Sequence, residues 1–492
     1  MSIQFTQIPD ELLVPGQYQE IDNSAAGSVG DIKKVLILGM KTQTGAAPAG
    51  AVVAISSESN ARAQLGEGSP AAVMAQNFLA LNKTDKLYAL PLAELVAGVK
   101  AVKSLTFTGP ATEDGTFTRY VNGRKVAIAV AKNDAAAAIA ASFVAACNSL
   151  RDMEVDASVD GVTPEKVLLT SLVKGLAGNQ TTVVAGIYGE KDPSGVTATF
   201  ANSVTGTGNP DVSDVLAAIG ETRYHYIITD LADTANLVAL SAELTSRYSG
   251  TRQIDGRLFL ALSGEDGDES TEGSLIAQAA GINSPHIVLI PRGINPQTPG
   301  VWGARFAAAL VRRLADDPAA NTTDTEIAGL IVTQERTASD RETLLKAGIA
   351  TYRASTTGVA LIERVVTSYT TNTDGDRDTS YLDVQVVETI SAIRAYINST
   401  ARTRYKTWKL ASTSENFGSG SKVMTPELWK GFLVELYQQV FIQEKQWCQD
   451  LEGYKNTILT EVDADGKTRL NWSHKPTLIG QFYIGAGLTQ FD

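Results

Sequence analysis

The sequence contains few of the residues on which metal and redox chemistry depend. Only two cysteines occur in 492 residues, Cys147 and Cys448, and they lie too far apart in sequence for a ligand or redox spacing. Histidine occurs three times, at His225, His286 and His474, without an H-x-H or H-x-x-x-H pair. We therefore expect buried thiols and structural histidines, with no disulfide framework, no metal and no cofactor.

Long apolar runs and excess positive charge are also missing. No stretch approaches the roughly 20 apolar residues that span a bilayer, and the start, MSIQFTQIPDELL, lacks the basic and apolar parts of a signal peptide. The formal net charge of −12 repels a phosphate backbone. We therefore expect a protein that is made and kept in a cytosol, does not insert into a membrane directly, and does not bind nucleic acid.

Signatures of common enzyme classes are absent. A phosphate-binding loop needs G-x-x-x-x-G-K-[ST], and the stretch GSGSK at 418–422 lacks that spacing and a preceding strand. No G-x-S-x-G nucleophile elbow occurs. Asp374, Asp376 and Asp378 alternate as in a calcium loop, but Gln385 replaces the bidentate glutamate. We predict a solvated loop at 371–383, with a weak cation site as the alternative.

The central part of the chain alternates apolar strands with amphipathic helices, which is typical of a parallel α/β sheet covered on both faces. Ser69 and Pro70 are suited to the N-cap and first position of a helix over the stretch that follows. The predicted strands are 33–39, 224–230, 257–263 and 285–291, and further helices are predicted at 233–248, 272–281 and 301–314.

Two other regions differ from this pattern. Residues 99–210 consist of short Thr-, Val- and Gly-rich strands around one Ala-rich helix at 134–147. In the last part, apolar spacing predicts a long helix from Val386 to Ile397 and a second over 425–451, followed by strands over 455–491. We therefore predict a multidomain α/β and α+β chain. Its parts are an N-terminal arm (1–30), a central α/β domain (31–98 and 211–380), an inserted β-rich outer domain (99–210) and a C-terminal helix-plus-strand domain (381–492).

The two chain ends have strand-like patterns where most chains fray. ELLVPGQYQEIDNS, residues 11–24, has a Pro-Gly turn among aromatic and β-branched residues. Near the other end, Leu478, Phe482, Ile484, Ala486 and Leu488 occupy alternate positions, as in a half-buried strand. A strand needs a neighbour for its hydrogen bonds, and that neighbour lies either in the same chain or in another.

Several segments, in order, resemble contractile tail sheath proteins of Mu-like bacteriophages, a family related to pyocin and type VI secretion sheaths. They are VPGQYQEIDNSAAG, KKVLILG and LGEGSPAAVMAQNFLALN near the start, and AIRAYINSTARTRYKTWKL and the closing strand near the end. The resemblance is strongest over 1–98 and 381–492, whereas 99–210 matches only as a variable insertion.

The resemblance implies a virion structural protein that assembles in the bacterial host cytoplasm as stacked hexameric rings, a helical sheath around the tail tube. Contraction without nucleotide hydrolysis would drive the tube through the host envelope. The implied partners are further copies of the chain, the tail tube protein, and the baseplate and tail terminator proteins. In the family, terminal extensions complete a sheet in a neighbouring subunit. The corresponding interface candidates here are Val14, Tyr18, Ile21, Phe482, Ile484 and Leu488.

A basic segment runs from Arg394 to Lys409 without an acidic residue. The helix dipole favours positive charge at a helix C-terminus, which explains such a segment structurally. The resemblance offers a second explanation, because it places the C-terminal domain on the inner wall of the sheath, facing acidic groups on the tube. The tube-facing candidates are Arg402, Arg404, Lys406, Lys409 and Lys430.

A second class of function stays open from the residues, namely a cytosolic α/β enzyme with an unrecognised site. Ligands of open α/β sheets bind beyond the carboxyl ends of the strands. The residues that follow the predicted strands there are Asp230, Ser263, Glu265, Asp266 and Arg292. Electron micrographs distinguish the two classes, since a sheath forms long hollow cylinders and an enzyme forms small particles.

Overall fold

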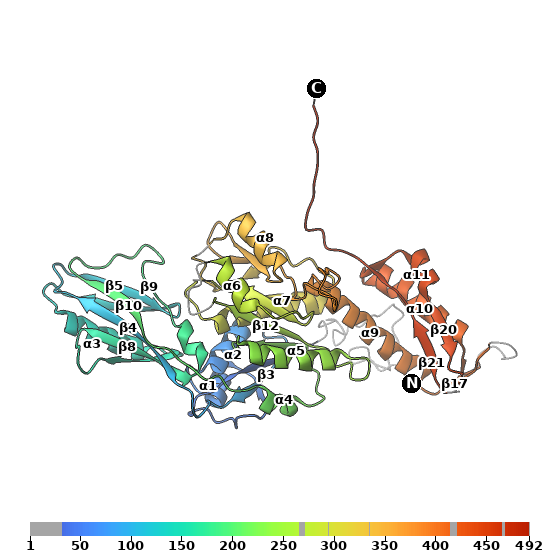
Figure 1. Ribbon diagram of the computed structural model, residues 1–492, viewed down its shortest axis with the longest axis horizontal. Helices are drawn as coiled ribbons and strands as arrows, with labels where there is room; N and C mark the ends of the chain where they lie inside the picture. The colour runs from blue at the N-terminus through green and yellow to red at the C-terminus, as the bar shows by residue number, and fades with distance from the viewer. Residues whose placement is uncertain are drawn as a thin grey trace, which may run out of the picture.

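The computed structural model describes residues 32–264, 271–293, 295–333, 335–413, 421–464 and 468–491. Over these residues the chain is a mixed α/β protein with several sheets and an elongated outline (Figure 1). Residues 100–204 lie at one end, and α10 (Pro426–Glu435) and α11 (Leu451–Thr457) lie at the other. The long helix α9 (Val384–Tyr405) connects the middle of the molecule to this second end.

The middle of the molecule is built on a six-stranded sheet in the order β13-β12-β11-β1-β3-β2. Neighbouring strands are parallel except for β2, which pairs antiparallel with β3 at the edge. This confirms the predicted parallel α/β sheet. The strands are β1 (Lys34–Met40), β2 (Val53–Ile55), β3 (Lys86–Leu92), β11 (Tyr226–Thr229), β12 (Arg257–Leu262) and β13 (Ile287–Pro291).

Helices cover both faces of this sheet because its strands are apolar on both sides. Val35 and Ile37 of β1 face the core formed with α1 (Glu58–Leu65), α2 (Pro70–Leu81) and α7 (Pro299–Asp316). Leu36 and Leu38 face the opposite core. That core is covered by α4 (Ser213–Ile219), α5 (Thr234–Tyr248), α6 (Glu272–Ala279) and α8 (Ala338–Lys346). The N-cap of α2 is Ser69, as predicted.

Residues 100–204 form a separate core, which we call the β4–β10 unit. Its sheets have the orders β10-β4-β8-β7 and β6-β5-β9, and Phe107, Phe117 and Phe143 pack between them and α3. Of the short strands predicted over this region, the one over TTVVAGIYG, residues 181–189, is reduced to the two-residue strand β9. The elements are β4 (Lys100–Thr108), β5 (Gly115–Val121), β6 (Arg124–Val130), α3 (Ala136–Ser149), β7 (Val155–Val159), β8 (Lys166–Lys174), the 3₁₀ helix η1 (Leu176–Gln180), β9 (Val183–Val184) and β10 (Thr197–Val204).

The last part of the chain packs around α9, whose residues Ile393 and Ile397 join a core with Phe432 and Leu433 of α10. Small strands flank this core. They are β17 (Lys409–Leu410), β18 (Val423–Met424), β19 (Cys448–Gln449), β20 (Leu459–Val462), β21 (Leu470–Ser473) and β22 (Thr477–Leu478). A further sheet before α9 contains β14 (Glu326–Ile327), β15 (Thr351–Ala354) and β16 (Ala360–Arg364).

The single helix predicted over 425–451 is wrong in its second half. After α10 the chain continues as a π-helix, η3 (Leu436–Glu444), which places Leu436, Tyr437, Val440 and Phe441 together in the core. Residues 446 and 450 then adopt positive φ angles of 56° and 58°, and the chain leaves the helical path. The predicted helix is therefore divided into α10, the π-helix η3 and a turn before α11.

The strands predicted over 455–491 are also only partly present. After β22, residues 479–491 contain no regular secondary structure, and the tail extends away from the molecule (Figure 1). Phe482, Ile484 and Leu488 are 82%, 78% and 85% exposed, so the predicted half-buried strand is absent from the single chain. The alternating pattern has no strand beside it among the described residues, and a strand cannot form without one.

Candidate functional site

The C-terminal tail is anchored to the fold by Tyr483 before it leaves the surface. Gln385 Nε2 donates to the Tyr483 hydroxyl at 3.0 Å, and the Arg364 guanidinium lies 4.8 Å from the centre of its ring. Burial raises the pKa of Tyr483 to about 12. Beyond this anchor the backbone extends away from the molecule (Figure 1), and Ile484 and Leu488 are exposed. The sequence pattern alone did not distinguish the anchored tyrosine from the exposed residues around it.

Four large apolar side chains of this segment are exposed, namely Phe482, Ile484, Leu488 and Phe491. The other interface candidates, Val14, Tyr18 and Ile21, lie outside the described residues. The structure therefore bears only on the C-terminal half of the predicted terminal interface.

The basic segment divides into paired and unpaired residues. Arg404 donates to Glu435 of α10 at 2.8 Å. Arg394 pairs with Asp255 and donates to the carbonyl oxygen of Tyr248 at 2.8 Å, so its charge serves packing between α9 and the middle of the molecule. The other four tube-facing candidates are exposed and form no ion pair with the described residues. They are Arg402, Lys406, Lys409 and Lys430.

A buried arginine joins α9 to the start of β12, an inner strand of the central sheet. Arg257 of β12 is 1% exposed and donates to the Val387 carbonyl at 3.0 Å and to Ser391 Oγ at 2.9 Å. Its Nε lies 3.3 Å from Glu388 Oε1. Since all three partners belong to α9, Arg257 fixes the orientation of this helix, which continues into the C-terminal core.

The three histidines have structural surroundings. His286 is buried, and burial together with Arg257 and Arg394 lowers its pKa to about 3, which keeps it neutral. His225 Nδ1 accepts the backbone N–H of Lys34 at 3.1 Å. His474 Nδ1 lies 2.7 Å from the Tyr454 hydroxyl.

The cysteine thiols of Cys147 and Cys448 are free and buried. The described part of the chain contains no group of three or more His, Cys, Asp or Glu side chains suited to a metal ion. No helix in it combines the length and apolar character of a membrane span.

Asp230 and Ser263 share a cavity of about 370 Å³ at the carboxyl ends of β11 and β12. Arg292 does not line it, since this buried residue donates through Nε to the Gln297 carbonyl at 2.6 Å. Glu265 and Asp266 lie outside the described residues. Residues of η1 line the cavity, so the β4–β10 unit occupies the edge of the sheet where an α/β enzyme would bind its ligand.

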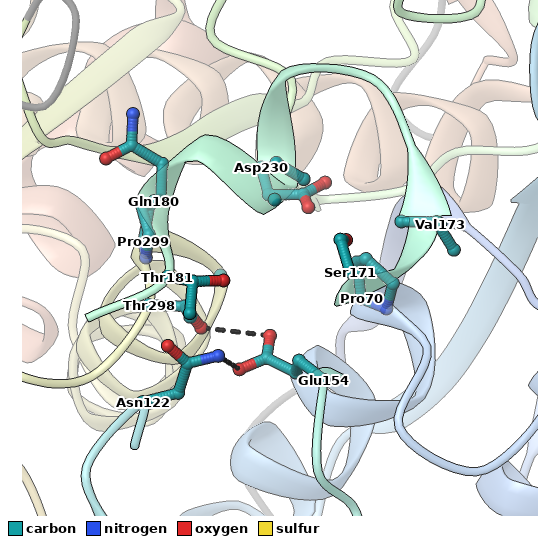
Figure 2. A pocket seen from close by; sticks show the side chains of 13 residues that line it. Pro70, Asn122, Glu154, Ser171, Val173, Gln180, Thr181, Asp230, Thr298 and Pro299 are labelled. Carbon is teal, nitrogen blue, oxygen red and sulfur yellow. Dashed lines mark hydrogen bonds between the residues drawn. The ribbon is translucent and has the colours of Figure 1, made fainter. Parts of the chain in front are cut away.

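A smaller cavity of about 30 Å³ lies next to it, between the β4–β10 unit and α7 (Figure 2). Glu154 accepts hydrogen bonds from Thr298 Oγ1 at 3.1 Å and Asn122 Nδ2 at 3.2 Å. Burial raises the pKa of Glu154 to about 7 and that of Asp230 to about 6. Sequence reasoning missed Glu154, because nothing around it signals a site. The carboxyl groups have no Ser, Cys or His nucleophile–base pair beside them, so they match no hydrolytic arrangement.

A model of the phage tail sheath protein central domain matches residues 205–368. The Mu-like prophage FluMu tail sheath protein of Haemophilus influenzae is 33% identical over 497 residues, covering 100% of both chains. The chain belongs to the phage tail sheath family. The resemblance to Mu-like tail sheath proteins is thus confirmed over the full length of this sheath protein.

Solved structures similar to the sheath chain include the sheath tail protein of Desulfitobacterium hafniense, at 14% identity and a TM-score of 0.44, covering 94% of this chain and 100% of that one. Another is the helical sheath of the anti-feeding prophage in its contracted state, at 12% identity and a TM-score of 0.44, covering 97% and 99%.

Proposed function

We propose that the chain is the repeating subunit of a contractile phage tail sheath. It would polymerise as stacked hexameric rings around a tail tube and contract to drive the tube through the host envelope. The sequence similarity to a Mu-like prophage sheath protein, 33% identity over the full length of both chains, supports this proposal. The observation that carries the assembly step is the exposed apolar tail beyond Tyr483.

In this proposal the tail adds a strand to a sheet of the neighbouring subunit. The exposed apolar side chains of Phe482, next to the anchor, and of Ile484, Leu488 and Phe491, beyond it, belong to none of the hydrophobic cores of the described residues. Burying each such side chain is worth about 1.5 to 3 kcal/mol, and main-chain hydrogen bonds along a strand edge would add specificity. The N-terminal arm, with Val14, Tyr18 and Ile21, is proposed to make the matching contact.

We further propose the division of the chain into arm, central, inserted and C-terminal domains at the boundaries predicted above. The C-terminal domain would face the tube, and the unpaired charges of Arg402, Lys406, Lys409 and Lys430 would contact it. Such contacts are individually weak and screened by salt, which suits a sheath that must release its tube. Baseplate and tail terminator proteins would bind the ends of the assembly.

We infer a structural rather than a catalytic role. The family is structural, and the cavity at the carboxyl ends of β11 and β12, where an enzyme would bind its substrate, is lined by no histidine, cysteine or lysine among the described residues. Contraction would be powered by relaxation of a stored assembly state through movement of whole subunits.

Electron microscopy of the purified full-length chain tests the proposal. We expect hollow helical cylinders from the natural chain. The double variant Ile484→Ser, Leu488→Ser should remain unassembled with an unchanged unfolding midpoint, because these residues lie beyond the Tyr483 anchor and touch no core. Thr489→Ser with Gln490→Ala is the matched control in the same tail and should assemble. Normal cylinders from the Ser variant would refute tail exchange, and small particles from the natural chain would refute a sheath.

A further inference from the structure

The β4–β10 unit is held against the middle of the molecule by a closed polar junction. Arg62 of α1 forms a two-bond ion pair with Asp152, through Nε at 2.8 Å and Nη2 at 2.7 Å. Gln76 of α2 donates to the same carboxylate at 3.0 Å. On the other side, Thr182 Oγ1 donates to the Pro296 carbonyl at 2.5 Å. The small cavity of Figure 2 lies between the same two parts of the chain, because Glu154 and Thr181 of the β4–β10 unit line it together with Asp230 and Thr298.

Two oxygen atoms that line this cavity have no hydrogen-bond partner among the described residues. They are Asp230 Oδ1 and Gln180 Oε1, and each has less than 1 Å² of accessible surface. A buried acceptor without a donor costs about 1 to 3 kcal/mol, so such groups normally contact a water molecule or an ion. The unpartnered oxygen of Asp230 therefore indicates a bound ligand, and this observation does not depend on the position of Glu154.

The second acid, Glu154, enters from the opposite side. Figure 2 shows Asp230 above the gap and Glu154 below it, with Ser171 beside them. The charged groups that act on Glu154 are Asp230, which raises its pKa, and Arg124, which lowers it. Burial is the largest cause of the raised pKa of each acid. Two carboxyl groups therefore share a small space with incomplete charge compensation.

We propose that this cavity binds one divalent cation of the calcium class, which bridges Asp230 of the central sheet and Glu154 of the β4–β10 unit. Calcium binds carboxylate and hydroxyl oxygens together with water. Ser171 Oγ would supply an uncharged oxygen beside Asp230, and bound water would supply the others, because the Gln180 amide points away from the gap between the two acids (Figure 2). Zinc is disfavoured because the lining has no thiolate or imidazole.

The dimensions and access of the cavity fit this occupant. A water molecule needs about 10 to 15 Å³ of such space, so about 30 Å³ accommodates a cation with one of its waters. The larger cavity of about 370 Å³ shares Asp230 and Gln180 with the small one and provides an entry path. The bound cation fastens the β4–β10 unit to the sheet, since its acidic ligands come from both.

Calcium titration of the chelator-treated full-length chain by isothermal calorimetry at pH 7.5 tests the proposal. We expect one calcium per chain, with affinity reduced about tenfold or more in Asp230→Asn and in Glu154→Gln. Asp156→Asn is the control, because Asp156 follows Glu154 by two residues but is exposed. The natural chain should also bind calcium less well at pH 5, where protons compete for both acids.

The outcomes that would overturn the proposal do not depend on whether the variants fold. Absence of calcium binding by the natural chain would overturn it and leave water or a proton as the occupant. Binding that is unchanged in Asp230→Asn, or unchanged between pH 7.5 and pH 5, would assign the calcium to surface carboxylates and equally overturn it.

Discussion

Replacement of Arg257 by methionine removes the buried charge that fastens α9 to the central sheet. The guanidinium is 1% exposed and contacts the Val387 carbonyl, Ser391 Oγ and Glu388. Breaking a buried ion pair from one side leaves the other charge uncompensated and typically costs about 3 to 5 kcal/mol. We expect the free energy of unfolding of Arg257→Met to fall by that amount, since Glu388 is only 15% exposed as a side chain.

The double variant Arg257→Met, Glu388→Leu should recover much of this loss, because it leaves no unpaired charge. The control is Arg353→Met, which removes an exposed arginine paired with Asp324 and should cost about 1 kcal/mol or less. Urea denaturation of the unassembled chain, followed by circular dichroism, measures these differences. The reasoning is refuted if Arg257→Met costs no more than Arg353→Met, or if the double variant is less stable than the single one.

Two further predictions concern charge and pH. Reversing Arg402 and Lys406 to Glu should prevent extended sheath on the tube while tube-free cylinders still form, as electron microscopy would show. The same charge change at the exposed Lys132 and Lys191 should have no effect, and normal tube-filled tails from the first variant would move the tube contact elsewhere. Burial raises the pKa of Asp230 to about 6 from 3.8, so its ionisation opposes folding above pH 6 and this cost disappears below pH 3.8. In chelator, Asp230→Asn should therefore be more stable than the natural chain at pH 8, by up to about 3 kcal/mol, and this advantage should shrink toward pH 4. Equal thermal unfolding midpoints of Asp230→Asn and the natural chain at pH 8 would contradict this prediction.

Local patterns in the sequence determined the elements of the central sheet. The apolar run at 33–39 is buried on both faces as β1, and the Ser69-Pro70 start of α2 follows from a capping hydroxyl and a missing N–H at adjacent positions. The apolar alternation in the tail was visible for the same reason, because a two-residue period is a property of the chain itself, whereas the exposure of these residues was not predicted.

Only the tertiary structure decided the features that depend on residues far apart in sequence. The change from α-helix to π-helix after Glu435 occurs where Tyr437 is buried in the C-terminal core, and the tail is not a strand because no strand lies beside it among the described residues. Asp230 and Glu154 line the same cavity only because the β4–β10 unit packs against the carboxyl ends of the sheet strands. Sequence periodicity reports how a segment is solvated, whereas the position of one buried charge relative to another depends on how whole elements pack.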